Sequence, residues 1–217
     1  MFRRLLCASD ATMNEACIKR DVIVIGTSAG GVEALLDLCR DLSPEIPAVM
    51  GVVIHRSPWS RTDVAAIYGH RTRIRVREAR HGEALQQGTV FFAPADRHLK
   101  FNKAGMMETS RGAKIHFTRP AVDELFTSAA ASFGHRVVGV LLTGNGSDGG
   151  HGLVMIKQYG GITLIQKPGE ASHPSMPLTG LREDTPDLVT LDELPSLLFA
   201  LALGQRVSTH APEPLAS

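Results

Sequence analysis

Short apolar runs, each ending at a turn, constrain the fold of this sequence more than any other feature. Residues 21–26, 49–54 and 137–142 are such runs, rich in valine and isoleucine. Continuous runs of this length are typical of strands that are buried on both faces of a parallel sheet. Helical patterns follow two of them, over residues 30–40 and 149–159. Repeated strand–helix units predict an α/β fold with a single doubly wound, mostly parallel sheet flanked by helices.

Weaker patterns supply the remaining expected elements. Residues 72–77 alternate between apolar side chains and arginines, which indicates a strand with one wet face near a sheet edge. Residues 98–102 and 106–109 flank a Lys-Ala-Gly turn and predict a small hairpin. Further strands are expected at 89–93 and 162–166, and further helices at 61–68, 120–133 and 191–203.

The length and composition fit one domain with two short extensions. The chain has 217 residues, of which 43% are hydrophobic, so it can bury a full core. We expect a flexible leader at 1–20, the folded domain at 21–203 and a flexible tail at 204–217. No apolar run approaches the roughly 20 residues that span a membrane. We therefore expect no membrane insertion.

Charge and cysteine content narrow the class of protein further. The formal net charge of +1 gives no overall field that would favour nucleic acid or anionic lipid. Cys7, Cys17 and Cys39 have neither disulfide nor metal-site spacing. Together these observations indicate a protein of a reducing compartment, and we expect it in the cytoplasm.

Three residues with catalytic potential directly follow predicted strands. Ser28 comes after the first run, His55 after the second, and Asp148 after the run at 137–142. In doubly wound folds, ligands bind beyond the carboxyl ends of the strands. Acyl transfer needs a hydroxyl nucleophile, an imidazole that takes its proton and a carboxylate that orients the imidazole. The placement predicts a serine hydrolase with a Ser28–His55–Asp148 triad.

The glycine-rich sequence around Ser28 also supports this prediction. Glycines beside a serine permit a sharp strand-to-helix turn, and the helix that follows directs its N–H groups toward the site. The N–H of Ala29 is then a natural oxyanion donor. Gly26-x-Ser28-x-Gly30 also matches the nucleophile elbow of α/β-hydrolases. That fold has the chain order Ser, acid, His, so the order found here does not assign it.

Simpler interpretations of each feature remain open. The glycine turn could bind phosphate at a helix N-terminus, and His55 could bond only to backbone. Asp148 could be a helix cap. A set of arginines could be a solvated face or a surface for an acidic partner; these are Arg56, Arg61, Arg71, Arg73, Arg75, Arg77 and Arg80.

Several segments in order resemble the catalytic domain of the CheB-type protein-glutamate methylesterases of bacterial chemotaxis. The resemblance covers about residues 21–201 and includes Gln166 and Met176-Pro177. The segments are 25–31 (IGTSAGG), His55, 92–98 (FAPADRH), 119–123 (RPAVD) and 142–149 (LTGNGSDG).

The resemblance implies hydrolysis of glutamate γ-methyl esters on the cytoplasmic helices of chemoreceptors or a receptor-like protein. It also implies some glutamine deamidation. No metal or organic cofactor is implied. The family's nucleophile, base and carboxylate fall on Ser28, His55 and Asp148, and Ala29 and Asn145 fall beside the oxyanion in the cleft.

Departures from the family pattern concern regulation and the cleft. About 20 residues precede the first strand in this sequence, where the family usually has a receiver domain, so we expect a stand-alone catalytic domain. Asn145 stands where the family typically has methionine, and Arg56-Ser57-Pro58 follows His55 where methionine and proline are more usual. Both changes make the cleft more polar. Two alternatives to an enzyme are a non-catalytic adaptor in a sensory complex and a nucleotide or phosphometabolite binder.

Overall fold

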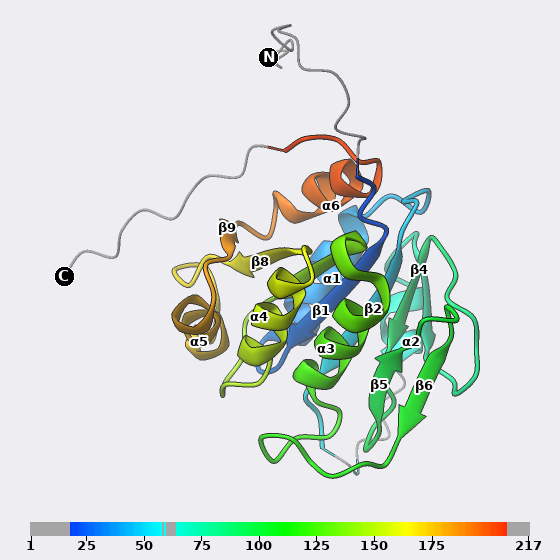
Figure 1. Ribbon diagram of the computed structural model, residues 1–217, viewed down its shortest axis with the longest axis vertical. Helices are drawn as coiled ribbons and strands as arrows, with labels where there is room; N and C mark the ends of the chain where they lie inside the picture. The colour runs from blue at the N-terminus through cyan, green and yellow to red at the C-terminus, as the bar shows by residue number, and fades with distance from the viewer. Residues whose placement is uncertain (1–17, 58, 60–63, 208–217) are drawn as a thin grey trace, which may run out of the picture.

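A seven-stranded parallel sheet forms the centre of the computed structural model, which describes residues 18–57, 59 and 64–207 (Figure 1). The strand order is β3-β4-β2-β1-β7-β8-β9. Every pairing within it is parallel. The strands are β1 (Val22–Thr27), β2 (Val49–Ile54), β3 (Arg75–Glu78), β4 (Thr89–Phe92), β7 (Val137–Leu141), β8 (Ile162–Gln166) and β9 (Asp187–Val189). The predicted fold class is confirmed.

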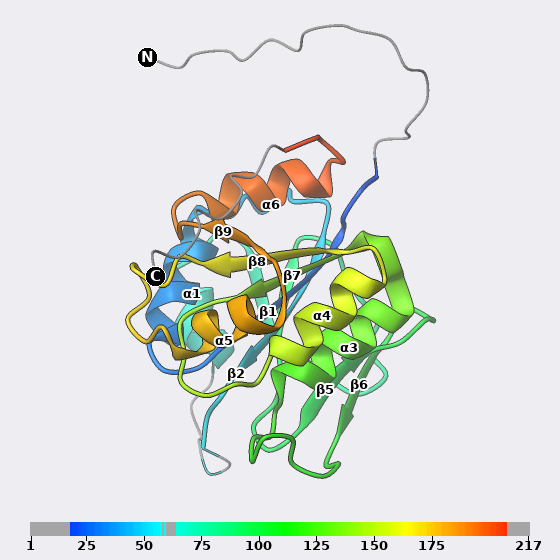
Figure 2. The same cartoon turned by 60° about the vertical axis from the view of Figure 1, so that its left-hand side comes forward.

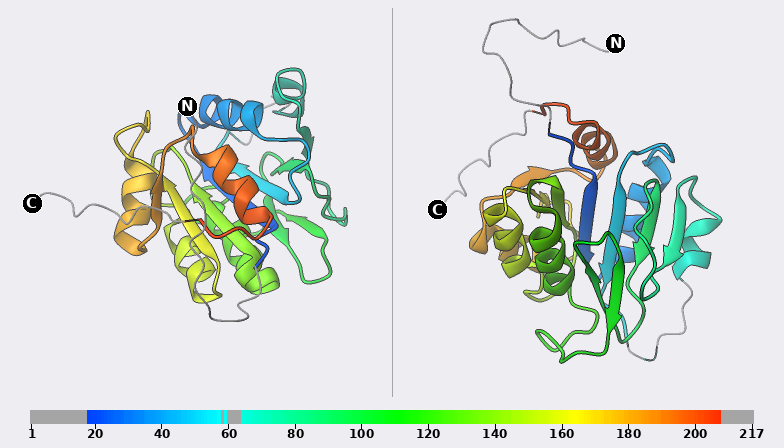
Figure 3. Two further views of the ribbon diagram at one scale, coloured as in Figure 1. Left: turned by 90° about the horizontal axis from the view of Figure 1, so that it is seen from above. Right: turned by 45° about the vertical axis from the view of Figure 1, so that its right-hand side comes forward.

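Helices cover both faces of this sheet (Figures 2 and 3). One face packs with α1 (Gly31–Asp41), Tyr68 of α2 (Val64–Gly69) and α6 (Leu194–Ala202). The other packs with α3 (Val122–Phe133), α4 (Gly150–Gln158) and Met176 of α5 (Ser175–Glu183). The antiparallel hairpin β5 (His98–Phe101) and β6 (Met107–Ser110) joins this second layer.

Side-chain alternation in the central strands explains why the sheet has two cores. Ile23 and Ile25 of β1 belong to the core that contains α1 and α6, whereas Val22 and Val24 belong to the core that contains α3 and α4. All four are at most 2% exposed. A strand buried on both faces has to be apolar throughout, which is the pattern that predicted it.

The strand register brings three chain segments to one edge of the sheet. Thr27 pairs with Ile54 across β1 and β2, and Gly26 pairs with Leu141 across β1 and β7. The segments that leave these three strands therefore emerge side by side. This edge is where the sequence predicted a site.

Most expected elements are confirmed to within a few residues. The hairpin and the edge position of β3 are confirmed as well. The helix expected at 61–68 is α2, whose first expected residues, 61–63, lie outside the described part of the chain. Residues 1–17 and 208–217 also lie outside it, so the leader and tail stay predictions.

Three elements were not expected from the sequence: α5, β9 and a single turn of 3-10 helix at Gly134–Arg136. Helix α5 contains both a proline and a glycine, which weaken a helical pattern. Strand β9 has only three residues. No described helix is long and apolar enough to cross a membrane.

Candidate active site

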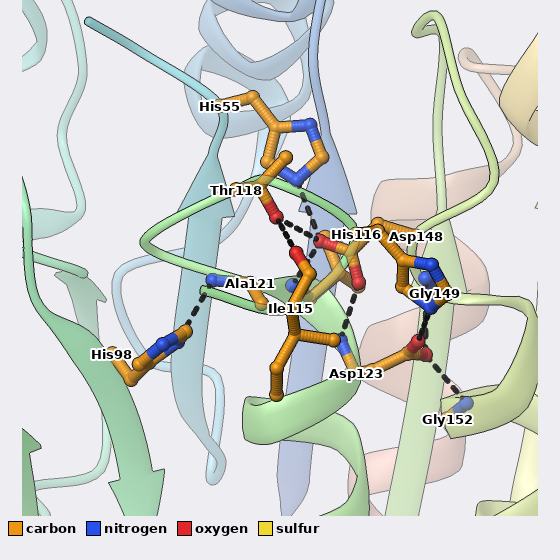
Figure 4. A network of polar contacts seen from close by, with 11 residues as sticks. His55, His98, Ile115, His116, Thr118, Ala121, Asp123, Asp148, Gly149 and Gly152 are labelled. Atoms are coloured by element: carbon orange, nitrogen blue, oxygen red, sulfur yellow. Dashed lines mark hydrogen bonds and ion pairs between the residues drawn. The ribbon is translucent and has the colours of Figure 1, made fainter. Parts of the chain in front are cut away.

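His55 and Asp148 meet at the carboxyl edge of the sheet. The His55 Nε2 atom lies 2.7 Å from Asp148 Oδ2 (Figure 4). His55 directly follows β2, and its backbone N–H donates to the Thr27 carbonyl at 3.1 Å. The pairing of β1 and β2 therefore fixes the position of the His55 backbone that carries the imidazole ring. Asp148 is in the loop between β7 and α4 and is 1% exposed. The pair is thus largely removed from water on the aspartate side.

Asp148 accepts hydrogen bonds from the start of α3 as well as from His55. The backbone N–H groups of Val122 and Asp123 donate to it at 2.7 and 2.9 Å, and the Thr118 hydroxyl donates at 3.1 Å. Burial alone would raise the pKa of Asp148. The bonds from His55 and the two N–H groups outweigh it and hold the pKa below its ordinary value. Asp148 is therefore a charged acceptor.

Asp148 does cap a helix, as one interpretation of the sequence allowed, and that helix is α3. Asp148 precedes α4 in sequence, yet the residue at the N-cap of α4 is Gly149, without a side-chain cap. The carboxylate instead caps α3, whose own N-cap residue, Ala121, has no side chain for the task. One group therefore anchors a helix and orients a histidine.

Ser28 occupies the turn between β1 and α1, at the same edge. Its backbone N–H donates to the Thr143 carbonyl at 3.1 Å, and its carbonyl accepts from Gly31 N–H at 2.9 Å. Because Thr27 and Ile54 are paired, Ser28 and His55 are the first residues beyond two adjacent strands. Within the described part of the chain the Ser28 hydroxyl makes no hydrogen bond to His55. Such bonds are often long in ligand-free structures.

The glycine at 144 permits the close approach of the β7 loop to this turn. A Cβ on Gly144 would lie 2.8 Å from Ser28 Cβ and 2.2 Å from Met176 Sδ. Gly144 also bonds to the start of α5 and to the segment before it. Its N–H donates to the His173 carbonyl at 2.8 Å, and its carbonyl accepts from Met176 N–H at 2.9 Å. The loop therefore presses on the Ser28 turn with no side chain between them.

Ala29 and Asn145, the other two residues expected in the cleft, differ in their surroundings: Ala29 is partly buried and Asn145 is exposed. Ala29 follows Ser28, and its carbonyl accepts from the Thr143 hydroxyl at 3.2 Å. Its N–H has no partner among the described residues, as an oxyanion donor requires. Asn145 is exposed in the β7–α4 loop. Gln166 is buried and accepts from Thr143 N–H at 2.9 Å, which ties β8 to this loop.

Asp123 is a buried carboxylate whose role was not predicted from the sequence. It is the last residue of segment 119–123, one of the segments that resemble the family. It accepts from the N–H groups of Gly149 at 3.0 Å and Gly152 at 2.7 Å, at the start of α4. Asp148, just before α4, thus binds N–H groups at the start of α3, and Asp123, in α3, binds N–H groups at the start of α4. Burial and the charge of Asp148 raise the pKa of Asp123 above its ordinary value. His116 Nε2 faces its other oxygen at 3.2 Å.

The loop that supplies Thr118 is fixed by a buried histidine. His98 Nδ1 accepts from Ala121 N–H at 3.2 Å (Figure 4). Its Nε2 lies 2.9 Å from the Ala113 carbonyl. His98 is 1% exposed. It therefore holds both ends of the loop that borders His55.

A hollow of about 270 Å³ opens beside His55. Its lining includes His55, Thr118, Arg56, Lys114 and Phe117. The lining thus carries basic side chains and one aromatic ring. No three histidine, cysteine or carboxylate side chains among the described residues are grouped to hold a metal ion.

This arrangement has the parts for acyl transfer by a hydroxyl. With Nε2–H directed at Asp148, the tautomer leaves the Nδ1 lone pair of His55 free to accept a proton. The tautomer follows from the acceptor-only character of the carboxylate.

Comparisons with known proteins identify the family and the fold. The CheB methylesterase family model matches residues 23–198. A protein-glutamate methylesterase/protein-glutamine glutaminase 2 of Anaeromyxobacter dehalogenans is 40% identical over 182 residues, which are 83% of this chain and 53% of that protein. A putative protein-glutamate methylesterase/protein-glutamine glutaminase of Leptospira interrogans is 32% identical over 83% of this chain and 94% of its own length. The chain thus spans about half of the first relative.

A solved structure is similar to nearly the whole described domain. The Thermotoga maritima CheB methylesterase catalytic domain superposes with a TM-score of 0.80 at 30% sequence identity. The match covers 85% of this chain and 100% of that one.

Proposed function

This chain belongs to the CheB methylesterase family, and we propose that it hydrolyses glutamate γ-methyl esters in proteins. Deamidation of glutamine side chains is the related second activity. The observation that carries the proposal is the 2.7 Å contact between His55 and buried Asp148, at the strand end next to Ser28. The names of the relatives in both Anaeromyxobacter and Leptospira support the same reaction.

In the proposed reaction, Ser28 is the nucleophile and His55 the general base. His55 Nδ1 takes the hydroxyl proton as Ser28 Oγ attacks the ester carbonyl carbon. The imidazolium that forms is stabilised by Asp148, whose pKa is held low. His55 then returns the proton to the methoxide oxygen, so the C–O bond breaks and methanol leaves. Water, deprotonated by His55, attacks the acyl-enzyme carbonyl; His55 then gives that proton to Ser28 Oγ as the acyl–oxygen bond breaks, which releases the glutamate carboxyl group and free Ser28.

The oxyanion of both tetrahedral intermediates would be held by backbone donors near Ala29. The Ala29 N–H precedes the first turn of α1, where the helix dipole favours negative charge. No cofactor or metal takes part in this reaction.

The substrate we propose is a methylated cytoplasmic helix of a chemoreceptor or a receptor-like protein. The enzyme would bind this helix in the cytoplasm. The basic side chains that line the hollow, Arg56 and Lys114, suit an acidic neighbourhood of the glutamate ester in the substrate. Nucleic acid and membrane insertion have no part in the proposal.

Methanol release tests the proposed function. A chemoreceptor cytoplasmic fragment carrying radiolabelled methyl esters is incubated with wild type, Ser28→Ala and Ser196→Ala. Ser196 is a serine of α6, away from the site, and serves as the matched control. We expect release by wild type and Ser196→Ala, and at least about a thousandfold less by Ser28→Ala. Equal release by Ser28→Ala would refute the assignment of Ser28.

A serine-directed fluorophosphonate distinguishes an enzyme from a non-catalytic adaptor. Wild type should be labelled at Ser28, and His55→Ala should be labelled far more slowly. An unlabelled wild-type protein that still binds the receptor fragment, without methanol release, would favour the adaptor.

A further inference from the structure

Residues 115–118 form a two-residue hairpin turn with an unfavourable sequence. Ile115 N–H donates to Thr118 O at 3.1 Å, and Thr118 N–H donates to Ile115 O at 2.8 Å. The two central residues, His116 and Phe117, have φ of 48° and 63°. Turns with positive φ at both central positions favour Asn and Gly. A bulky aromatic residue in this conformation points to a task for its side chain.

Phe117 gains nothing from burial in this structure. It is 96% exposed, and it lines the same hollow as His55. A fully exposed phenylalanine costs solubility without contributing to a core. The ring is therefore available to a molecule that enters the hollow.

The turn is attached to the two aspartates of the site. The Thr118 hydroxyl donates to Asp148 Oδ2 at 3.1 Å, and His116 Nε2 lies 3.2 Å from Asp123 Oδ2 (Figure 4). These contacts flank Phe117 in sequence, so the backbone that carries the ring has a defined position relative to His55. An aromatic side chain has only two rotatable bonds, so on a fixed backbone it loses little entropy when it makes a contact.

We propose that Phe117 is a specificity-determining residue that packs against an apolar side chain next to the ester in the protein substrate. The inference rests on the proposed function and adds a requirement for the segment that presents the ester. That segment carries an apolar residue for Phe117 and an acidic residue for Lys114, which lines the same hollow. A small free ester lacks both contacts and should not depend on Phe117.

The test compares a protein substrate with a small one. Wild type, Phe117→Ala and Tyr159→Ala are assayed with the methylated chemoreceptor cytoplasmic fragment and with 4-nitrophenyl acetate. Tyr159 follows the carboxyl end of α4 and is 46% exposed, so it is a matched exposed aromatic away from the site. We expect Phe117→Ala to raise KM for the fragment about tenfold. Its kcat/KM for 4-nitrophenyl acetate should stay within about twofold of wild type.

A second variant separates recognition from a structural role. Phe117→Gly relieves the positive φ, so it should raise the thermal midpoint while it lowers kcat/KM for the fragment. Unchanged kcat/KM for the fragment in both variants overturns the inference. Equal losses on both substrates also overturn it, because Phe117 would then act on the shape of the site.

Failure of the proposed function would look different. If wild type releases no methanol from the fragment, the esterase assignment falls and the inference falls with it. If wild type and Tyr159→Ala release methanol and Phe117→Ala matches them, only the inference is wrong.

Discussion

Asp148 makes hydrogen bonds that only a carboxylate can accept together. Oδ2 receives His55, Thr118 and Val122 N–H, while Oδ1 receives Asp123 N–H. An asparagine has one oxygen, so its NH₂ group must face an N–H at one of these places. The residue is therefore not replaceable by its nearest isostere.

Asp148→Asn should lower both stability and activity. We expect a loss of about 1–3 kcal/mol in the free energy of unfolding, because a buried N–H loses its acceptor. We also expect kcat for the esterase reaction to fall by about 10⁴, because the amide no longer stabilises the His55 imidazolium or its tautomer. Urea unfolding and methanol release measure the two effects.

The pH dependence of the Asp148→Asn comparison has a defined sign. The pKa of Asp148 is lowered by folding, so its charged form stabilises the native state at pH values above the ordinary aspartate pKa, about 3.9. The stability gap between wild type and the variant should be full at neutral pH and shrink as pH falls through the lowered pKa. A gap that grows on acidification would contradict this.

Asp123 should behave in the opposite way. Folding raises its pKa, so between about pH 3.9 and the raised value the native state binds more protons than the unfolded chain, and stability decreases as pH rises. Asp123→Asn can still accept from Gly149 and Gly152, yet it removes the repulsion with Asp148. We expect its stability to rise relative to wild type as pH increases, measured by urea unfolding from pH 4 to 7.

Asp123→Ala is the control for the acceptor itself. It leaves the two N–H groups without a partner and should cost about 1–3 kcal/mol. An Asp123→Asn variant as unstable as Asp123→Ala at neutral pH would show that the charge is required.

At the scale of elements, the site depends on loops that press together without side chains between them. Gly144→Ala would place a methyl group 2.8 Å from Ser28 Cβ and 3.0 Å from Ser28 N. Met176 Sδ can move away, but the turn after β1 cannot. We expect a loss of about 1–3 kcal/mol in stability and of about a hundredfold in kcat/KM.

Gly169→Ala is the matched control for that substitution. A Cβ there meets nothing within 4 Å, and its φ is not positive. Thermal unfolding and methanol release should both match wild type. If Gly144→Ala also matches wild type, the close approach at Ser28 does not constrain the turn.

The same elements show which parts of the fold a sequence can predict. Strands β1, β2 and β7 were identifiable because burial on both faces requires continuous apolar runs. Their ends then indicated Ser28, His55 and Asp148. The bonds from Asp148 to the start of α3 and from Asp123 to the start of α4 were not predictable, because they join residues 25 to 29 positions apart in the chain. Helix α5 was missed because Pro177 and Gly180 break its pattern.

At the scale of the molecule, strand register divides the arginines that the sequence grouped together. Arg75 begins β3 and lies level with Thr89, which pairs with Val49 at the start of β2. The site lies beyond Ile54, and five residues at about 3.3 Å each make this a separation of roughly 17 Å. Arg56 is at the site edge and pairs with Glu78 at 3.0 Å. Arg75 and Arg56 therefore lie near opposite ends of the sheet, and Arg61 lies outside the described residues.

Lys114, not the arginines at the start of β3 and just before it, should govern electrostatic attraction of the substrate. Lys114 lines the hollow beside His55. We expect Lys114→Glu to lower kcat/KM for the methylated receptor fragment about tenfold at low salt, with the difference from wild type shrinking at about 0.5 M NaCl. The double variant Arg73→Glu, Arg75→Glu carries twice the charge change at the far end of the sheet, and its kcat/KM should stay within about twofold. A larger loss in the double variant than in Lys114→Glu would mean that the substrate reaches the amino end of the sheet, away from the site.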